Sequence, residues 1–285
     1  AIGKQVNFVS NDIQEYSKVL SQTYLVNLRD ADIPDIDHIH QQVLDLVAAN
    51  VQKEYLVDYN KLNDIEDFNC LEENQKDLIN KDFSYDYHLF AKNYSGTWWS
   101  YEQCLWIDAL REVADEYKDK PIYPIFLSSL MYSMAYCSQG TGHYAQYRDA
   151  KTNSSFNDIC IYRKKEVFKF FHKKFNELCT YSLNTKSKVN SAFLSADFKE
   201  ALKTFEGGTV YADPPYCFVH YSRFYHALET LVLYDYPEIQ KKNNVIVKGR
   251  YREDRHQSPF CIKTKVEDAF LDMFKGVEST KSQLA

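Results

Sequence analysis

Short apolar stretches alternate along the chain with longer segments in which apolar residues recur every three or four positions. Residues 5–10, 190–196 and 209–212 are short and rich in β-branched or aromatic residues, a pattern that predicts strands. A further strand is expected at 244–248. Strands near both ends of the chain, with helical repeats between them, predict an α/β fold that contains a large helical segment.

Helical repeats fill the middle of the chain. Ser100 and Gln103 have the spacing of a capping box, so a helix is expected to begin there, and Pro121 is expected to end it. The next segment, 125–136, is apolar almost throughout and predicts a more deeply buried helix. Residues 31–95 are acidic and polar, so we expect most of that segment to be solvated helical surface.

The composition is that of a globular protein. The chain has 285 residues, of which 45% are hydrophobic and 15% aromatic, enough for one large domain or for a core with an insertion. No run approaches the roughly 18 apolar residues that a membrane helix needs, and no secretory signal is found. Seven cysteines without a Cys-x-x-Cys pair predict reduced thiols in a cytoplasmic protein, and no metal site.

Charge is distributed unevenly, although the net charge of −6 at first argues against nucleic-acid binding. Residues 1–150 hold 12 Lys and Arg against 24 Asp and Glu, whereas residues 151–285 hold 22 against 16. Because contacts with phosphates are local, a basic second half is compatible with DNA as a partner. The basic run at 163–174 is expected to be a solvated helix face, with DNA contact as the alternative.

The stretch 209–216 carries the most specific chemistry. A short apolar strand is expected to run directly into Asp213, Pro214, Pro215 and Tyr216, where the prolines cannot donate ladder hydrogen bonds and fix φ. An acid and an aromatic residue are then left at the carboxyl end of a strand, where open α/β sheets bind their ligands. An ordinary strand-ending turn is the plainer interpretation of the Pro-Pro pair alone.

The Asp-Pro-Pro-Tyr sequence resembles the catalytic motif of DNA methyltransferases that transfer a methyl group from S-adenosyl-L-methionine to the N6 of adenine. The resemblance implies that Asp213 and the Pro214 carbonyl accept the N–H groups of the target amine and make its nitrogen more nucleophilic. The rigid corner at Pro214 and Pro215 would hold that carbonyl in place. Tyr216 would stack on the adenine after it flips out of the duplex. Methyl transfer would then be a direct displacement without a covalent enzyme intermediate.

Two further acids follow predicted strands in the order that this methyltransferase family shows. The segment 9–17 resembles the family's ribose-binding segment, which implies that Asp12, with Ile13 beside it, holds the ribose of the cofactor. Asp197 and Phe198 resemble the pair that borders the cofactor adenine, where the carboxylate accepts from the N6 amine and the ring packs on the base. Helix capping is the plainer interpretation of both acids, and for Asp12 the two roles are compatible.

Three loops rich in basic and aromatic residues are expected to face duplex DNA. The loop at 140–148 does so by resemblance, with a plain interhelical loop as the alternative. The loop at 217–226 is expected to close over the flipped base and the DNA gap, although Tyr221 and Tyr225 could instead anchor the core. The loop at 249–259 is expected to contact phosphates or base edges. The predicted DNA-binding residues are His143, Tyr144, Arg148, His220, Tyr221, Arg223, Arg250, Arg252 and Arg255.

The resemblance divides the chain into two parts. Residues 1–30 and 186–285 are expected to form a Rossmann-like class I methyltransferase domain, and residues 31–185 a mostly helical target-recognition insertion. The family's Phe-x-Gly-x-Gly loop, which contacts the methionine part of the cofactor, is not found in the chain. We therefore expect either a fragment cut at both ends or a loop supplied by another polypeptide.

The sequence is thus interpreted as a site-specific, adenine-specific DNA methyltransferase. We expect it to act in a restriction-modification system, with a cognate restriction endonuclease as a partner. The adenine assignment depends on Asp213, because enzymes that methylate cytosine N4 more often have Ser there. Two alternatives stay open: a methyltransferase-like DNA-binding subunit without activity, and an N4-cytosine or RNA methyltransferase.

Overall fold

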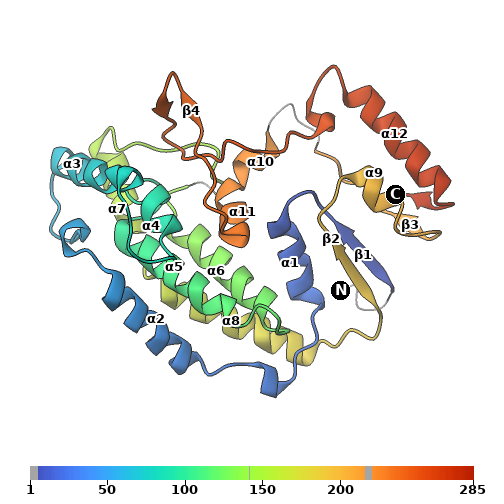
Figure 1. Ribbon diagram of the computed structural model, residues 1–285, viewed down its shortest axis with the longest axis horizontal. Helices are drawn as coiled ribbons and strands as arrows, with labels where there is room; N and C mark the ends of the chain where they lie inside the picture. Colours follow the sequence, from blue (N-terminus) through green and yellow to red (C-terminus); the bar gives the residue numbers. More distant parts are fainter. Residues whose placement is uncertain (1–5, 141, 216–219) are drawn as a thin grey trace.

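The computed structural model describes residues 6–140, 142–215 and 220–285 and shows a mostly helical molecule with short strands (Figure 1). The helices form a large body, and most strands lie to one side of it, close to both ends of the chain. The α-helices are α1 (Glu15–Leu25), α2 (Ile36–Asn50), α3 (Ile65–Lys76), α4 (Leu89–Tyr94), α5 (Tyr101–Asp115), α6 (Tyr123–Cys137), α7 (Asn153–Arg163), α8 (Val167–Asn184), α9 (Phe198–Leu202), α10 (Tyr221–Phe224), α11 (His226–Leu233) and α12 (Val266–Ser279). The strands are β1 (Phe8–Asn11), β2 (Ser191–Leu194), β3 (Thr209–Val210), β4 (Lys241–Lys242), β5 (Val245–Ile246) and β6 (Gln283–Leu284).

Helices α5, α6 and α8 form the centre of the helical body, with α1 and α2 packed against them. The sequence of α6 is apolar around most of the helix, so it is buried on several sides, as predicted. Phe126 of α6 packs against Phe171 and Phe175 of α8, with ring centroids 4.8 and 5.9 Å away. All three rings are buried, which places this contact at the centre of the apolar core.

The capping box predicted at the start of α5 is confirmed. Ser100 Oγ accepts a hydrogen bond from Gln103 N at 3.1 Å, and Gln103 Oε1 accepts one from Ser100 N at 3.0 Å. Further along α5, Asp108 is buried and accepts from Phe90 N at 2.9 Å and from Ala91 N at 2.8 Å. These N–H groups belong to the first turn of α4, where they have no partner within the helix. The carboxylate of Asp108 therefore fixes α4 against α5.

Two pairs of parallel strands lie on the right of Figure 1. β1 pairs with β2 along its whole length, from Phe8 opposite Ser191 to Asn11 opposite Leu194, and β3 pairs with β6 in the same direction. Helices α1 to α8 lie in the connection between β1 and β2. The strands predicted near both ends are therefore confirmed, although β3 is shorter than its prediction and the described strands form pairs, not one continuous sheet.

One carboxylate joins α11 to the start of α1. Glu229 of α11 accepts hydrogen bonds from Glu15 N at 3.1 Å and from Tyr16 N at 3.0 Å. Both are N–H groups of the first turn of α1, which have no partner within their own helix, so Glu229 caps α1 from another element. The segment that follows the Asp-Pro-Pro-Tyr sequence thereby fixes the helix that follows Asp12.

The strand predicted at 244–248 is present but shorter than predicted. Val245–Ile246 is one arm of a short hairpin and pairs antiparallel with Lys241–Lys242. Asn243 and Asn244 have φ of 53° and 62°, the left-handed values of a two-residue hairpin turn. Because the chain reverses at this turn, the segment folds back on itself and does not join the parallel strands.

The basic run at 163–174 also begins differently from its prediction. Arg163 is the last residue of α7, a helix that the sequence pattern did not predict, and α8 begins at Val167. Arg163 is buried, whereas Lys169 and Lys173 are exposed. The expectation of a solvated basic face therefore holds for α8 but not for the first residue of the run.

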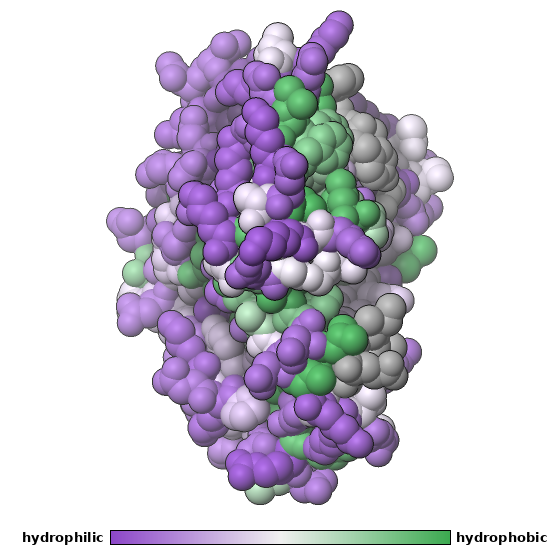
Figure 2. Space-filling model, turned by 90° about the vertical axis from the view of Figure 1, so that its right-hand side faces the viewer, coloured by the Kyte–Doolittle hydropathy of each residue, from purple (hydrophilic) through white to green (hydrophobic). Residues whose placement is uncertain are grey.

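The face that Figure 2 presents belongs to the side with the strand pairs and α12. It is mostly hydrophilic, with apolar patches among the polar side chains. Next to the β3–β6 pair, Tyr211 and Leu284 are 78% and 43% exposed, and Val9 of β1 is 42% exposed. Apolar side chains at this exposure, beside strand edges, are typical of surfaces that contact other protein segments.

Candidate active site

The carboxyl ends of β1 and β2 are held side by side. The side chain of Asn11, at the end of β1, accepts a hydrogen bond from Ala196 N at 3.1 Å and donates one to Ala196 O at 3.0 Å. Asp12 follows Asn11 directly, and Asp197 follows Ala196. The pairing of the two strands therefore brings these two acids, which are far apart in the sequence, to the same edge.

Both acids hydrogen-bond to the backbone two residues further on, near the starts of α1 and α9. Asp12 Oδ1 accepts from Gln14 N, and Asp197 Oδ1 accepts from Lys199 N, both at 2.9 Å. Among the described residues the second oxygen of each carboxylate has no partner. The capping interpretation is confirmed for Asp197, the N-cap of α9, and each acid retains an oxygen that can accept from a ligand hydroxyl or amine.

Phe198 and the segment before Asp213 meet in one apolar cluster. The rings of Phe198 and Phe260 lie 5.2 Å apart, at an angle of 56°. Phe198 and Ala212 both pack against the small buried cluster beside α12 that includes Phe260. Because Ala212 precedes Asp213, this cluster joins the end of β3 to the start of α9.

Asp213 is exposed just after β3. Backbone hydrogen bonds with Ala285 extend the β3–β6 ladder as far as Ala212, the residue before it. Within residues 6–140, 142–215 and 220–285 the Asp213 carboxylate has no hydrogen-bond or ion-pair partner, and the two prolines that follow are half-buried. Its backbone is thus held by the strand while its side chain is available to a ligand. Tyr216 lies outside the described residues.

A cavity of about 380 Å³ opens beside the start of α1. It lies between that helix, helices α10 and α11, and the loop that follows β5, and its lining includes Ile13, Glu229, Arg252 and Arg255. Burial raises the pKa of the Glu229 carboxyl. The cavity therefore connects the neighbour of Asp12 with the loop that was expected to contact DNA.

His226 forms the buried wall of this cavity. Its ring is fully buried, lies 5.0 Å from the Tyr251 ring at 87°, and places Nδ1 3.3 Å from Tyr94 Oη. Its Nε2 has no partner among the residues that the structure describes. Burial, together with the nearby Arg255 guanidinium, lowers the pKa of His226 to about 3. The ring is therefore neutral at physiological pH.

We expect His226 to destabilise the fold as the pH falls. The unfolded chain binds a proton at this histidine near pH 6.5, but the folded chain does so only near pH 3, so the free energy of unfolding decreases as the pH falls between these values. The decrease is about 1.4 kcal/mol for each pH unit. Urea unfolding at several pH values gives the free energy of unfolding of the wild type and of His226→Gln. The change of their difference with pH measures the contribution of His226. A difference that stays constant with pH would contradict a neutral, buried ring.

Three of the predicted DNA-binding residues are buried. Tyr144 is 3% exposed, and its ring stands 5.5 Å from that of Trp98. Arg250 and Arg252 are 6% and 8% exposed, and Arg252 makes two 2.7 Å hydrogen bonds with the Asp235 carboxylate. These side chains contact protein where the sequence predicted contact with DNA, because their loops fold into the interior and Arg252 is already neutralised.

The other predicted DNA-binding residues are more accessible. Arg148 is partly exposed and forms an ion pair with Asp158. Tyr221 is half-buried, with its ring 6.0 Å from that of Phe224. The remaining four reach the surface wholly or in part: His143, His220, Arg223 and Arg255. All four are accessible basic groups, and the exposed His256, which lines the cavity beside α1, is another.

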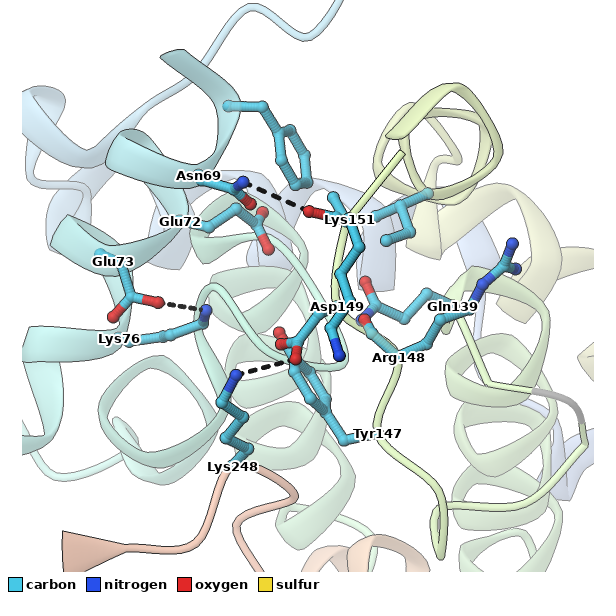
Figure 3. A pocket seen from close by; sticks show the side chains of 13 residues that line it. Asn69, Glu72, Glu73, Lys76, Gln139, Tyr147, Arg148, Asp149, Lys151 and Lys248 are labelled. Atoms are coloured by element: carbon cyan, nitrogen blue, oxygen red, sulfur yellow. Dashed lines mark hydrogen bonds and ion pairs between the residues drawn. The ribbon is translucent and has the colours of Figure 1, made fainter. Parts of the chain in front are cut away.

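A second cavity, of about 250 Å³, lies in the helical body (Figure 3). Charged side chains from α3, from the loop after α6 and from the segment after β5 line it, and two ion pairs link them: Lys76 with Glu73 at 2.7 Å and Lys248 with Asp149 at 2.8 Å. Sequence reasoning missed this cavity, because its lining comes from distant segments and each charge resembles an ordinary solvated one. No spacing in the sequence identifies it.

In the described ranges, 6–140, 142–215 and 220–285, no group of His, Cys, Asp and Glu side chains could hold a metal ion. In the same ranges no helix has both the length and the apolar character that crossing a bilayer requires.

Known proteins resemble this chain over nearly its whole length. The family model described as D12 class N6 adenine-specific DNA methyltransferase matches residues 3–280. The modification methylase LlaI of Lactococcus lactis subsp. lactis is 24% identical over 277 residues, which cover 95% of this chain and 37% of that protein. The type II methyltransferase M.FokI of Planomicrobium okeanokoites is 23% identical over 295 residues, which cover 94% of this chain and 41% of that protein. The chain thus spans about two fifths of the length of these relatives, and no solved structure matches it.

The family match includes each of the three acids that follow strands. Asp12, Asp197 and Asp213 all lie within residues 3–280, in the order expected from the resemblance. The match leaves the individual roles of these residues as predictions, but it confirms the family that the Asp-Pro-Pro-Tyr sequence indicated. The chain belongs to the family of D12 class N6 adenine-specific DNA methyltransferases.

Proposed function

We propose that the protein containing this chain methylates the N6 of adenine in duplex DNA, with S-adenosyl-L-methionine as the methyl donor. The observation that carries the proposal is the exposed Asp213 carboxylate at the end of β3, in a chain of this family. The relatives' names, modification methylase and type II methyltransferase, favour a restriction-modification system with a cognate endonuclease.

In this proposal Asp213 and the backbone carbonyl of Pro214 bind the target amine. Each oxygen accepts one N–H, which turns the nitrogen lone pair away from the ring of the base and makes it nucleophilic. Pro214 and Pro215 have fixed φ, so the carbonyl needs little reorganisation in the transition state. S-adenosyl-L-methionine, when bound, would supply its sulfonium methyl group for direct displacement, with S-adenosyl-L-homocysteine as the leaving group. After methyl transfer the nitrogen releases a proton, and the adjacent Asp213 carboxylate accepts it. Tyr216 stacks on the flipped base.

The acids at the ends of β1 and β2 fit the adenosine part of the cofactor. The free oxygen of Asp12 suits ribose hydroxyl groups, and that of Asp197 suits the adenine amine, because a carboxylate accepts hydrogen bonds from both. Phe198, held against Phe260, offers a ring for the adenine to pack on. Ile13 is 39% exposed beside Asp12 and completes the proposed cofactor-binding set.

We further propose that the two strand pairs belong to one Rossmann-like sheet, formed by residues 1–30 and 186–285, with residues 31–185 as the target-recognition insertion. Both pairs are parallel, and in each pair an acid follows the carboxyl end of a strand. β1 and β3 each pair on one side only within the described residues, so each has an edge that another strand can join. The exposed apolar side chains beside these edges support the same arrangement.

Transfer of labelled methyl from S-adenosyl-L-methionine to unmethylated duplex DNA, followed by digestion to nucleosides, tests the reaction. The full-length protein is used. Label in N6-methyladenine is the expected result. Label in N4-methylcytosine would keep the mechanism but refute the base assignment. No label, together with no cofactor binding, would favour the non-catalytic DNA-binding alternative.

A further inference from the structure

Arg223 and Arg255 share one tyrosine ring. Arg223 of α10 places Cζ 4.4 Å from the centroid of the Tyr251 ring, and Arg255 places Cζ 5.5 Å from the same centroid. Arg223 Nη2 also donates a hydrogen bond to Tyr251 Oη at 3.1 Å. Two guanidinium groups on one ring form a like-charge pair, which attraction to the π face offsets only in part.

Neither arginine has a carboxylate partner within residues 6–140, 142–215 and 220–285. Arg255 Nη2 donates to Gln240 Oε1 at 3.1 Å, while its Nε and Nη1 are buried without a partner. Glu253 is near enough to act on the Arg255 charge, but in the described part of the chain it forms no ion pair with Arg255. Burial and the neighbouring Arg223 lower the pKa of Arg255, as expected of a cation that lacks an anion.

The surroundings hold this ring and its two arginines in place. Tyr251 is 6% exposed and donates from Oη to Ala145 O at 2.7 Å. A Cβ atom at Gly249 would lie 2.3 Å from Tyr251 Cζ, so the ring could not occupy this position beside any other residue. Ser222 Oγ donates to His256 O at 2.6 Å, which ties α10 to the loop that carries Arg255. The two guanidinium groups are therefore positioned before any ligand binds.

We propose that Arg223 and Arg255 together bind a single phosphate group of the DNA backbone. Guanidinium groups match the oxygens of a phosphate, and the phosphodiester supplies the negative charge that this pair lacks. The cavity that Arg255 lines also includes Ile13, the neighbour of Asp12, and Arg223 follows Asp213 closely in the chain. The phosphate is therefore one near the target nucleotide. This inference rests on the proposed function, which identifies DNA as the source of the phosphate.

Fluorescence anisotropy of a labelled DNA duplex, titrated with the full-length protein at several salt concentrations, tests the site. The logarithm of the association constant falls linearly with the logarithm of the salt concentration. Each phosphate contact makes this slope steeper by about 0.9. Because both arginines hold the same phosphate, the double variant should reduce the slope by about 0.9 in total, and neither Arg223→Ala nor Arg255→Ala should reduce it by more than that. Arg29→Ala, which removes an exposed arginine paired with Asp32, is the matched control and should leave the slope unchanged.

A double variant that reduces the slope by about 1.8, one full contact for each arginine, would show two separate phosphates and overturn the inference. An unchanged slope in the double variant would also overturn it. If the wild type then binds inorganic phosphate and the double variant does not, the arginine pair binds a free anion and not the DNA backbone. If Arg255→Ala fails to fold, Arg255→Lys replaces it in the test. Lysine keeps the positive charge but lacks the planar guanidinium group, so this variant should bind the duplex more weakly with an unchanged salt slope. Wild-type affinity in Arg255→Lys would contradict the inference.

The two proposals fail in different ways. If the wild type binds duplex DNA and the variants show the expected change in salt slope, but no methyl group is transferred, the enzyme proposal is refuted and the phosphate site stands. A wild type that methylates DNA while the variants keep its salt slope would refute only the phosphate site. A wild type that does not bind DNA would refute both.

Discussion

Replacing Asp213 by alanine is expected to lower the turnover of methyl transfer about 100- to 1,000-fold while leaving duplex binding nearly unchanged. The carboxylate is one of only two acceptors proposed for the target amine, and its contribution grows as the nitrogen becomes positively charged in the transition state. Its side chain is exposed and has no hydrogen-bond or ion-pair partner in the described part of the chain, so the fold does not depend on it. Initial rates at saturating DNA and cofactor measure the effect, and thermal unfolding checks the fold.

Two further variants make this test specific. Asp213→Asn keeps one acceptor oxygen without the charge, so its turnover should lie between those of the wild type and Asp213→Ala. Asp119→Ala removes another exposed carboxylate, between α5 and α6, and should keep wild-type turnover. Near-normal turnover in Asp213→Ala, or an equal loss in Asp119→Ala, would refute the role assigned to Asp213.

The strand ends were predictable because their signal is local. Asp12, Asp197 and Asp213 each follow a short apolar stretch, and that pattern predicts a strand and the acid after it from a few neighbouring residues. The pairing of β1 with β2 across the long helical connection has no such local signal, and neither does the Asn11 side chain that joins them through Ala196. The three acids could thus be identified from the sequence, but the proximity of Asp12 to Asp197 required the structure.

The basic loops show where local patterns stop being informative. Arg252 and Arg255 lie in the same loop and look alike in the sequence, yet Arg252 is neutralised by Asp235 whereas Arg255 has buried N–H groups without a partner. The difference depends on where the chain after α11 places Asp235, which periodicity and composition do not specify. Tyr144 is a similar case, because its burial against Trp98 depends on how the loop after α6 folds back.

The largest difference between sequence and structure is a buried ion pair in the helical body. Glu72 lies in the acidic segment expected to be solvated, and Arg163 begins the run expected to be a basic surface, but their side chains are 3% and 0% exposed. Arg163 donates to the two Glu72 oxygens at 2.9 and 2.7 Å and to Thr97 O at 2.6 Å. Tyr59 Oη donates to Glu72 Oε1 at 3.1 Å. The pair thereby links α3 to α7 and to the segment before α5.

Arg163→Met is therefore expected to reduce the free energy of unfolding by about 3–5 kcal/mol, because it leaves the Glu72 carboxylate buried without its counter-ion. Glu72→Met should cost a similar amount, because it leaves the Arg163 guanidinium buried without an anion. The exposed pair between Lys203 and Glu200 provides the control, since Lys203→Met should change stability by less than about 1 kcal/mol. Urea unfolding measures all three variants, and an Arg163→Met loss no larger than that of the control would contradict the prediction.

The double variant Glu72→Met with Arg163→Met separates the pair's own contribution from the cost of an unpaired charge. If most of each single loss comes from the charge left behind, the double variant should lose much less than the two single losses added together. Some loss must remain, because Thr97 O would then lack its Arg163 donor, at about 1–3 kcal/mol for a buried polar group, and Tyr59 Oη would keep only its 3.5 Å contact with Gln75 Oε1. Additive losses would show instead that each side chain stabilises the helical body through separate contacts.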